Sequence, residues 1–166
     1  QLTLLNRLKK DDRRTRQVIS LPGMCQYRTT RRIDGDYTLK VSDVYRHFAD
    51  SITAVNDFEH RNFLYEIPYR TLVRKGYDNL ITAGRSASGE GYAWDIVRVI
   101  PPAILTGQAA GCAAAQALSD GVGIDGIDVP KLQNTLAQQN VLLHFDDSWI
   151  PKEGEPEVKE GPSNHI

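Results

Sequence analysis

A long helix with regularly spaced small residues is the strongest constraint on how this chain can fold. Pro101 and Pro102 suit a first helical turn, where a backbone N–H would be unpaired, and Gly121 suits the position just past a helix end. The helix is predicted to run from about Pro102 to Ser119. Small residues recur in it every four positions, at Ala103, Gly107, Gly111 and Ala115. Because positions four apart share a helix face, we expect this stripe to pack closely against a sheet.

The segment before this helix has the order strand, glycine, loop. Residues 79–84 form a short apolar run that ends at Gly84, and residues 85–91 hold small side chains without a regular pattern. A second extended segment is predicted for residues 64–70, where Pro68 favours a strand end because it has no N–H to donate. In open α/β sheets, ligands bind beyond the carboxyl ends of strands. The strand end at Gly84 is therefore a candidate ligand site, and an ordinary turn is the alternative.

Further patterns predict secondary structure on either side of these elements. Residues 28–33 and 37–41 are expected to form a strand pair, with residues 34–36 as its turn. Ser42 is suited to cap a helix whose buried stripe would be Val44, Phe48 and Ile52. Asp128 is suited to cap another helix, with Leu132 and Leu136 on its apolar side.

Composition limits the class of protein. The 166 residues suit one domain, and 20 Lys and Arg against 21 Asp and Glu give a net charge of −1. This balance argues against a nucleic-acid protein that depends on a strongly basic surface. The mean hydropathy is −0.41, and no apolar run approaches the roughly 20 residues of a membrane helix. We therefore expect neither a nucleic-acid partner nor a membrane span.

The N-terminal region carries no recognisable targeting signal, which leaves the cellular compartment open. The chain begins at Gln1 without an initiator Met, which suggests a processed chain or a piece of a longer one. Residues 1–20 are polar and basic, and we interpret them as an arm or linker. Contact with a nucleic acid or a phosphate is the alternative for their basic run.

Motifs of known chemistry are either misplaced or missing. Residues 121–126 fit G-x-G-x-x-G, but a dinucleotide site needs this motif between a strand and a helix, and here it follows a helix. We interpret it as a connector. The four His and two Cys show no metal-ligand spacing, so no metal site is predicted. Asp57 and His60 could form an acid–base pair, and an ordinary structural histidine is the alternative.

Several blocks of sequence, taken in order, resemble one known family. They are I-P-Y-R-T-L at 67–72, D-N-L-I-T-A-G-R at 78–85, R-V-I-P-P at 98–102 and T-G-Q-A-A-G at 106–111. Upstream, R-T-T-R-R-I at 28–33 is similar to the start of the family's R-x-x-R-R-I-x-G-x-Y-x-L segment. Over about residues 25–142, the set resembles the C-terminal portion of FAD-dependent oxidoreductases related to the fumarate reductase flavoproteins.

The resemblance implies an α+β or α/β fold, formed by the C-terminal part of a two-part, Rossmann-like FAD-binding domain and a piece of the cap or substrate domain. Residues 21–66 would then belong to the cap or substrate domain, 67–142 to the FAD-binding domain, and 143–166 to a polar tail. The N-terminal half of the same protein, which would carry the G-x-G-x-x-G motif, becomes the expected partner of this chain.

The resemblance also implies a cofactor and a reaction. The residues expected at FAD are Gly84, Arg85, Ser86, Arg98, Val99, Ile100 and Pro101, and the helix dipole there would favour negative charge on the reduced ring. The whole enzyme would transfer a hydride between a small organic substrate and the flavin. Candidate catalytic or substrate contacts are His60, Arg31, Arg32 and Arg28, with a salt-bridged hairpin as the alternative for the arginines.

This segment alone is expected to be inactive and not to retain FAD, because the pyrophosphate site would be missing. A non-catalytic remnant or an interaction module that lacks the cofactor is the alternative. The alternative would explain, without any truncation, why the chain has no G-x-G-x-x-G motif between a strand and a helix.

Overall fold

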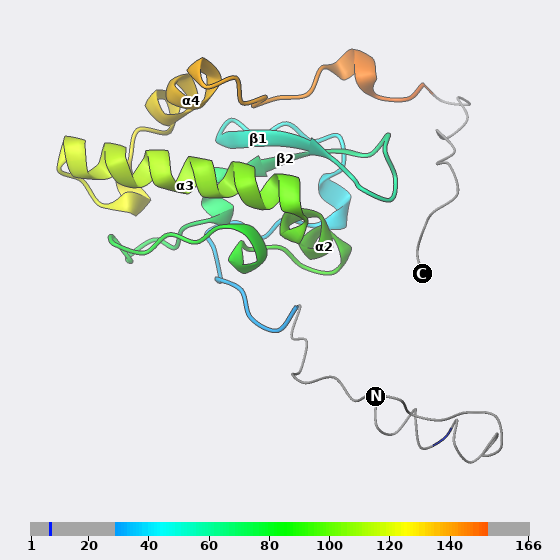
Figure 1. Ribbon diagram of the computed structural model, residues 1–166, viewed down its shortest axis with the longest axis horizontal. Helices are drawn as coiled ribbons and strands as arrows, with labels where there is room; N and C mark the ends of the chain where they lie inside the picture. The colour runs from blue at the N-terminus through cyan, green and yellow to red at the C-terminus, as the bar shows by residue number, and fades with distance from the viewer. Residues whose placement is uncertain (1–6, 8–28, 153–166) are drawn as a thin grey trace, which may run out of the picture.

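The computed structural model describes Arg7 and residues 29–152. Apart from Arg7, the predicted arm at residues 1–20 lies outside the described residues, as do Arg28 and residues 153–166 of the predicted tail. The described part combines helices with one small antiparallel sheet (Figure 1). This arrangement agrees with the α+β form of the predicted fold.

The sheet is a hairpin of two strands, β1 (Ser51–Asn56) and β2 (Leu64–Pro68). Ser51 lies opposite Pro68 and Asn56 lies opposite Leu64, with one irregularity near the Ser51 end. Every residue of β2 is buried, as are the first four of β1. The hairpin is therefore covered on both faces, and Pro68 ends its strand as predicted.

The described residues hold three α-helices of more than six residues: α2 (Tyr92–Arg98), α3 (Ile100–Asp120) and α4 (Val129–Gln138). The long α3 crosses the hairpin, and α4 packs against both α3 and β1 (Figure 1). Gly121 ends α3 in the left-handed conformation, with φ of 66°. The side chain of Asp128 caps α4 by accepting a hydrogen bond from the Lys131 amide. Both helices and their caps were predicted correctly from the sequence.

The stripe of small residues on α3 does not pack as expected. The buried residues of α3 are Pro102, Thr106, Ala109, Ala113, Gln116 and Ala117. Gly107, Gly111 and Ala115 instead lie on the exposed side. A Cβ added at Gly107 or Gly111 would meet no atom of the described residues within 4 Å. The expected contact between this stripe and a sheet is therefore not made within the described residues, since the hairpin packs on the opposite side of α3.

The predicted strand pair at residues 28–33 and 37–41 is also wrong. The Ile33 amide donates to Ser86 O at 2.9 Å, and the Leu39 amide donates to Ser88 O at 2.9 Å. Leu39 forms a single parallel bridge with Gly89. These residues therefore line the loop at 86–89 instead of pairing with each other, because that loop offers the backbone partners.

Residues 79–84 form no strand either. They contribute one isolated bridge, between Ile81 and Val73, and then enter a short 3₁₀ turn, η3 (Gly84–Ser86). Further single 3₁₀ turns are η2 (Tyr69–Thr71), η4 (Ile124–Gly126) and η5 (Asp147–Trp149). The turn η4 lies within the G-x-G-x-x-G run, between α3 and α4, so that run is a connector as predicted.

The helix expected after Ser42 is replaced by a single turn, η1 (Val41–Asp43), and Ile52 lies in β1. The buried Asp43 carboxylate accepts the Lys40 amide at 2.9 Å and the Tyr37 hydroxyl at 2.7 Å. Arg46 forms an ion pair with it at 3.0 Å. These contacts stabilise a tight turn, and the helical periodicity of the sequence gave no sign of them.

The chain after α4 packs along β1 (Figure 1). The Ala54 amide donates to Leu142 O at 2.7 Å, and the Ser51 hydroxyl donates to Leu143 O at 2.6 Å. The Phe145 side chain is 4% exposed. The packed structure therefore continues beyond residue 142, where the polar tail was expected to begin.

No single helix among residues 29–152 has both the length and the apolar composition to cross a membrane. Only α2 and α3 taken together satisfy that test, and they are bent by 70° relative to each other.

Candidate functional site

The segments that the sequence assigns to the cofactor meet at the start of α3. The Gly84 amide in η3 donates to the Thr106 hydroxyl oxygen at 2.9 Å. That hydroxyl in turn donates to Pro102 O at 2.7 Å, within the first turns of the same helix. Thr106 is fully buried. One threonine side chain therefore fixes η3 to the N-terminal end of α3.

Gly84 itself could not easily be another residue. Its φ is 58°, in the left-handed region that favours glycine. A Cβ at this position would lie 3.2 Å from the Cβ of Ala103. The absence of a side chain thus allows η3 to approach the first turn of α3 closely.

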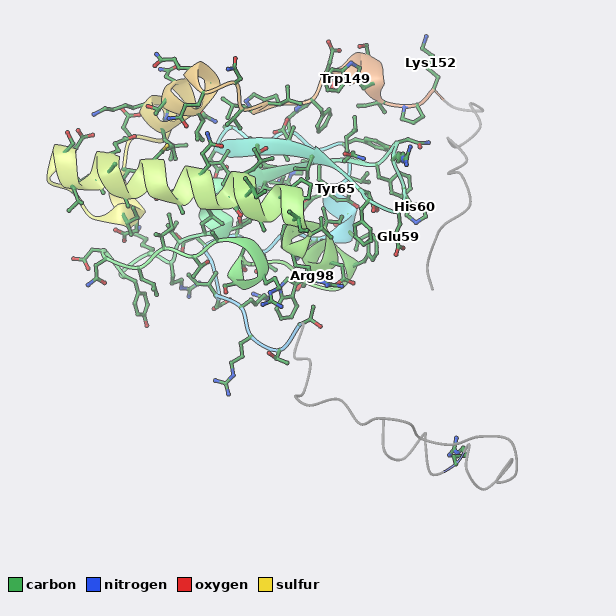
Figure 2. The ribbon with its side chains drawn as sticks, viewed as in Figure 1. Glu59, His60, Tyr65, Arg98, Trp149 and Lys152 are labelled. Atoms are coloured by element: carbon green, nitrogen blue, oxygen red, sulfur yellow. The ribbon has the colours of Figure 1, made fainter. Side chains whose placement is uncertain are left out.

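The helix α2 completes this junction. The Trp94 indole N–H donates to Arg85 O at 2.9 Å, which joins α2 to η3. At the end of α2, the Arg98 Nε donates to the Asp95 carboxylate. Figure 2 shows Arg98 below the end of α3 at which that helix begins. Arg85 and Ser86 are exposed, as is Ile100 at 75%.

The N-terminus of α3 offers few free donors. Pro101 and Pro102 have no N–H, and the Ala103 amide donates to Val99 O at 3.0 Å. The first turn therefore offers at most the Ile100 amide, together with the positive end of the helix dipole. We call the set formed by η3, α2 and the first turn of α3 the α3 junction.

Of the candidate catalytic residues, Arg32 lies beside this junction. Its Nη1 donates to the Ser88 hydroxyl at 2.9 Å and to Ile33 O at 3.0 Å, which holds the guanidinium on the loop that follows η3. Arg31 is exposed. His60 is exposed on the β1–β2 connection, where its ring lies 5.1 Å from that of Phe63.

The expected pairing of Asp57 with His60 is replaced by a contact with Tyr92. The Tyr92 hydroxyl donates to Asp57 Oδ1 at 2.9 Å, and the Glu59 amide donates to the same oxygen at 2.8 Å. Asp57 Oδ2 is buried and has no hydrogen-bond partner among the described residues. Burial first, and then the Asp57 carboxylate, raise the pKa of the Tyr92 hydroxyl, so this group stays protonated as a donor.

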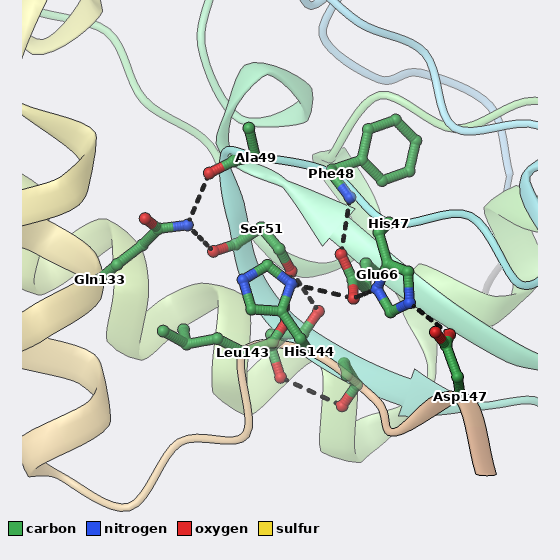
Figure 3. Close-up of polar contacts among 11 residues, drawn as sticks. His47, Phe48, Ala49, Ser51, Glu66, Gln133, Leu143, His144 and Asp147 are labelled. Carbon is green, nitrogen blue, oxygen red and sulfur yellow. Dashed lines mark hydrogen bonds and ion pairs between the residues drawn. The ribbon is translucent and has the colours of Figure 1, made fainter. Parts of the chain in front are cut away.

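A second group of polar side chains lies on the hairpin, and Figure 3 shows its contacts. The Glu66 side chain in β2 is fully buried, and its Oε1 lies 2.6 Å from His47 Nδ1 and 3.0 Å from His144 Nδ1. Its Oε2 accepts the Phe48 amide at 2.7 Å. The other ring nitrogen of His47 lies 2.8 Å from Asp147 Oδ1. We call His47, Glu66 and His144 the histidine cluster.

The environment of His47 favours its charged form. The hydrogen bond to Asp147, followed by the one to Glu66, raises the pKa of the His47 imidazole. The ring of His47 also stacks on Phe145, with centroids 4.2 Å apart. The loop before β1 and the C-terminal segment are thereby joined through one side chain.

The sequence analysis missed the histidine cluster because its members are far apart in the chain and lie in three different segments. The one available signal was Glu66, an acidic residue within an otherwise apolar extended run, which predicts a buried carboxylate that needs partners. Nothing in the sequence identified those partners as His47 and His144.

A family model describes most of the chain. Residues 9–136, more than half of the 166 residues, match the model for FAD dependent oxidoreductases. The chain belongs to the FAD dependent oxidoreductase family. No curated protein and no solved structure gave a significant match.

Family membership supports a redox function in general, with FAD as the cofactor of the family. The matched range includes the whole α3 junction, together with His47 and Glu66. His144 and Asp147 lie beyond the matched range. The α3 junction therefore lies entirely within the matched range, whereas the histidine cluster lies partly outside it.

One pocket of the described structure lies on the hairpin and not at the α3 junction. It has a volume of about 250 Å³ and is lined by Ala54, Val55, Asn56, Leu64, Leu142, Phe145 and Trp149. The lining is largely apolar and lacks charged side chains. This pocket therefore offers a surface for an apolar group, but no acid or base for chemistry.

Proposed function

We propose that this chain is the C-terminal part of an FAD-dependent oxidoreductase related to the fumarate reductase flavoproteins. In this proposal the whole protein transfers a hydride between a small organic substrate and FAD. The observation that carries the proposal is the contact of Gly84 with Ala103 and Thr106, because it brings the predicted cofactor residues together at one end of α3.

The residues of the α3 junction fit a bound flavin nucleotide. Gly84 lets η3 lie close to the first turn of α3, and Arg85 and Ser86 are exposed beside it. Arg98 and the positive end of α3 favour negative charge on a ligand. FAD held there would supply the hydride-transfer chemistry. The role of this chain is then to position the cofactor and to set the local electrostatic field.

The exposed side of α3 supports the second part of the proposal, that an N-terminal half of the same protein packs here. Residues three or four apart form one continuous stripe on this side, namely Ile100, Ile104, Gly107, Gly111, Ala115 and Leu118. Ile104 and Leu118 are 63% and 86% exposed. Small residues between apolar ones allow a sheet to approach closely, which is what a Rossmann-like half-domain would provide.

The experiment compares this chain with the complete protein from the same reading frame. FAD is titrated into each purified protein, and flavin fluorescence reports binding. We expect stoichiometric binding by the complete protein and weak or no binding by the 166-residue chain alone, since the pyrophosphate site would be missing. Tight binding by the chain alone would contradict the need for a second half.

A substitution in the stripe tests how α3 is covered. Gly111→Leu adds a large side chain where the described residues leave open space, so the isolated chain should fold as before. In the complete protein the same change should displace the covering sheet and lower FAD affinity. A complete protein that binds no flavin even without this substitution would favour the alternative, an interaction module whose bare α3 surface binds another protein.

A further inference from the structure

We propose that the histidine cluster is a binding site for a divalent transition-metal ion of the Zn²⁺ class, with His47 Nδ1, His144 Nδ1 and Glu66 Oε1 as ligands. The three residues each offer a ligand atom within 4.8 Å of those of the other two, and both Nδ1 atoms lie within 3.0 Å of Glu66 Oε1. They come from the loop before β1, from β2 and from the C-terminal segment (Figure 3). This proposal does not depend on the proposed oxidoreductase function.

The ligand types select the kind of ion. Two imidazole nitrogens and one carboxylate oxygen suit zinc and neighbouring transition metals, whereas Mg²⁺ and Ca²⁺ prefer sites built from oxygen. Bonds of about 2.0–2.1 Å would place ligand atoms roughly 3.3 Å apart in a tetrahedral site. The observed separations of 2.6 and 3.0 Å are slightly shorter than this. Both imidazoles are close to half exposed, at 42% and 46%, so they can rotate by the small amount that is needed.

The hydrogen bonding around His47 also favours a cation at its inner nitrogen. When neutral His47 donates its Nε2–H to Asp147, the lone pair of Nδ1 points at Glu66 Oε1, which is itself an acceptor. Two acceptors at 2.6 Å need a proton or a metal ion between them. Metal-binding histidines typically donate their other ring N–H to a carboxylate, as His47 does to Asp147.

Charge and backbone support complete the argument. Glu66 and Asp147 contribute two carboxylates, and with neutral imidazoles their charge matches that of one divalent ion. The second oxygen of Glu66 is held by the Phe48 amide, so its first oxygen is fixed in direction. The backbone bonds of Leu142 and Leu143 to β1 bring His144 to the site. Three protein ligands leave a fourth position open to solvent.

The test uses the 166-residue chain after treatment with a chelator and removal of that chelator. ZnCl₂ is titrated at neutral pH by calorimetry, and Co²⁺ serves as a probe whose visible absorption reports nitrogen ligands. We expect saturable binding of one ion per chain. Amide hydrogen exchange of residues 141–150 should slow when Zn²⁺ is added, because the ion would join the C-terminal segment to the hairpin.

Variants decide where the ion binds. His144→Gln removes an exposed ligand and should abolish saturable binding and the protection of residues 141–150. Asp147→Asn should lower Zn²⁺ affinity by about 10–100-fold, as outer contacts to a metal ligand usually do. His60→Gln is the matched control, since His60 is also exposed but lies outside the cluster. The proposal is overturned if the chain shows no saturable binding, or if His144→Gln binds Zn²⁺ as tightly as the unchanged chain.

Discussion

The hairpin and the outer side of α3 differ in how completely the chain covers them. On the hairpin, the buried carboxylate of Glu66 finds partners from two distant segments, in His47 and His144. The outer side of α3 instead exposes Ile100, Ile104 and Leu118 at 75%, 63% and 86%. Large exposed apolar surfaces on a helix usually mark a site of contact with another surface.

This difference shows which part of the molecule is structurally self-sufficient. The hairpin, α4 and the C-terminal segment supply one another with hydrogen bonds; for example, Gln133 Nε2 donates to Ala49 O and Ser51 O at 2.9 Å each. The α3 junction is equally well fixed on its inner side by Thr106. Only its outer side lacks cover from the described residues. We therefore expect the proposed N-terminal half to matter for the ligand site and not for the stability of the hairpin.

The largest contrast should come from removing apolar side chains in the two regions. Ile67 in β2 is fully buried, so Ile67→Ala should lower the free energy of unfolding by about 2–5 kcal/mol, through lost burial and the cavity left behind. Leu118→Ala on the outer side of α3 should change it by less than about 0.5 kcal/mol. Urea unfolding followed by circular dichroism measures both in the isolated chain.

Equal losses for Ile67→Ala and Leu118→Ala would show that the outer side of α3 is already covered in the isolated chain. In the complete protein, by contrast, Leu118→Ala should become destabilising. The two proteins together therefore distinguish a surface that is always bare from one that a second half covers.

A smaller effect is expected at the α3 junction. Gly84→Ala introduces a Cβ at φ of 58° and 3.2 Å from Ala103, which should cost about 1–2 kcal/mol for the left-handed backbone alone. Gly126→Ala is the control, because its Cβ would meet no atom of the described residues within 4 Å. Thermal unfolding of both variants measures the difference. If Gly84→Ala were as stable as Gly126→Ala, the close contact between η3 and α3 would be wrong.

The elements that could be predicted from the sequence are those with local signals. The proline pair and Gly121 predicted the limits of α3, and Asp128 predicted the start of α4, because caps act on neighbouring backbone groups. The resemblance in the blocks at 67–111 predicted the family that residues 9–136 match. The meeting of η3 with α3 also followed from the assignment of Gly84 and Pro101 to one site, although their roles at FAD remain predictions.

The failures share a physical cause, which is the dominance of long-range contacts over local periodicity. The stripe of Val44, Phe48 and Ile52 fits a helix, but Phe48 donates its amide to Glu66 and Ile52 lies in β1. Residues 79–84 look like a strand but find no neighbouring strand among the described residues. The histidine cluster could not be predicted at all, since no local pattern connects His47 with His144.

The cap of α4 provides a local test within the self-sufficient region. The Asp128 carboxylate accepts the Lys131 amide at 3.1 Å, so Asp128→Ala should lower the free energy of unfolding by about 1 kcal/mol. Asn134→Ala, on the exposed side of the same helix, should leave it nearly unchanged. Chemical unfolding curves compare the two. If Asp128→Ala left the free energy of unfolding unchanged, α4 would depend on its packing alone.

The smallest effect concerns the response of the hairpin to alkaline pH. Burial first, and then the charges of Asp57 and Asp43, raise the pKa of Tyr65 from 10.0 to about 12. Between these values the folded chain keeps a proton that the unfolded chain has lost, so the stabilisation from Tyr65 is complete below about pH 10 and is lost as the pH rises towards 12. Tyr65→Phe removes this contribution and the hydrogen bond from its hydroxyl to Val41 O.

At neutral pH Tyr65→Phe should therefore cost no more than about 1 kcal/mol, the net worth of one hydrogen bond. Its unfolding free energy should then fall less steeply with pH above about 10 than that of the unchanged chain. The slope should not vanish, because burial and Asp43 also raise the pKa of Tyr37 to about 12. Urea unfolding at a series of alkaline pH values measures both slopes. Identical slopes would mean that Tyr65 is already solvated in the folded chain, and the hairpin would then be no better closed than the outer side of α3.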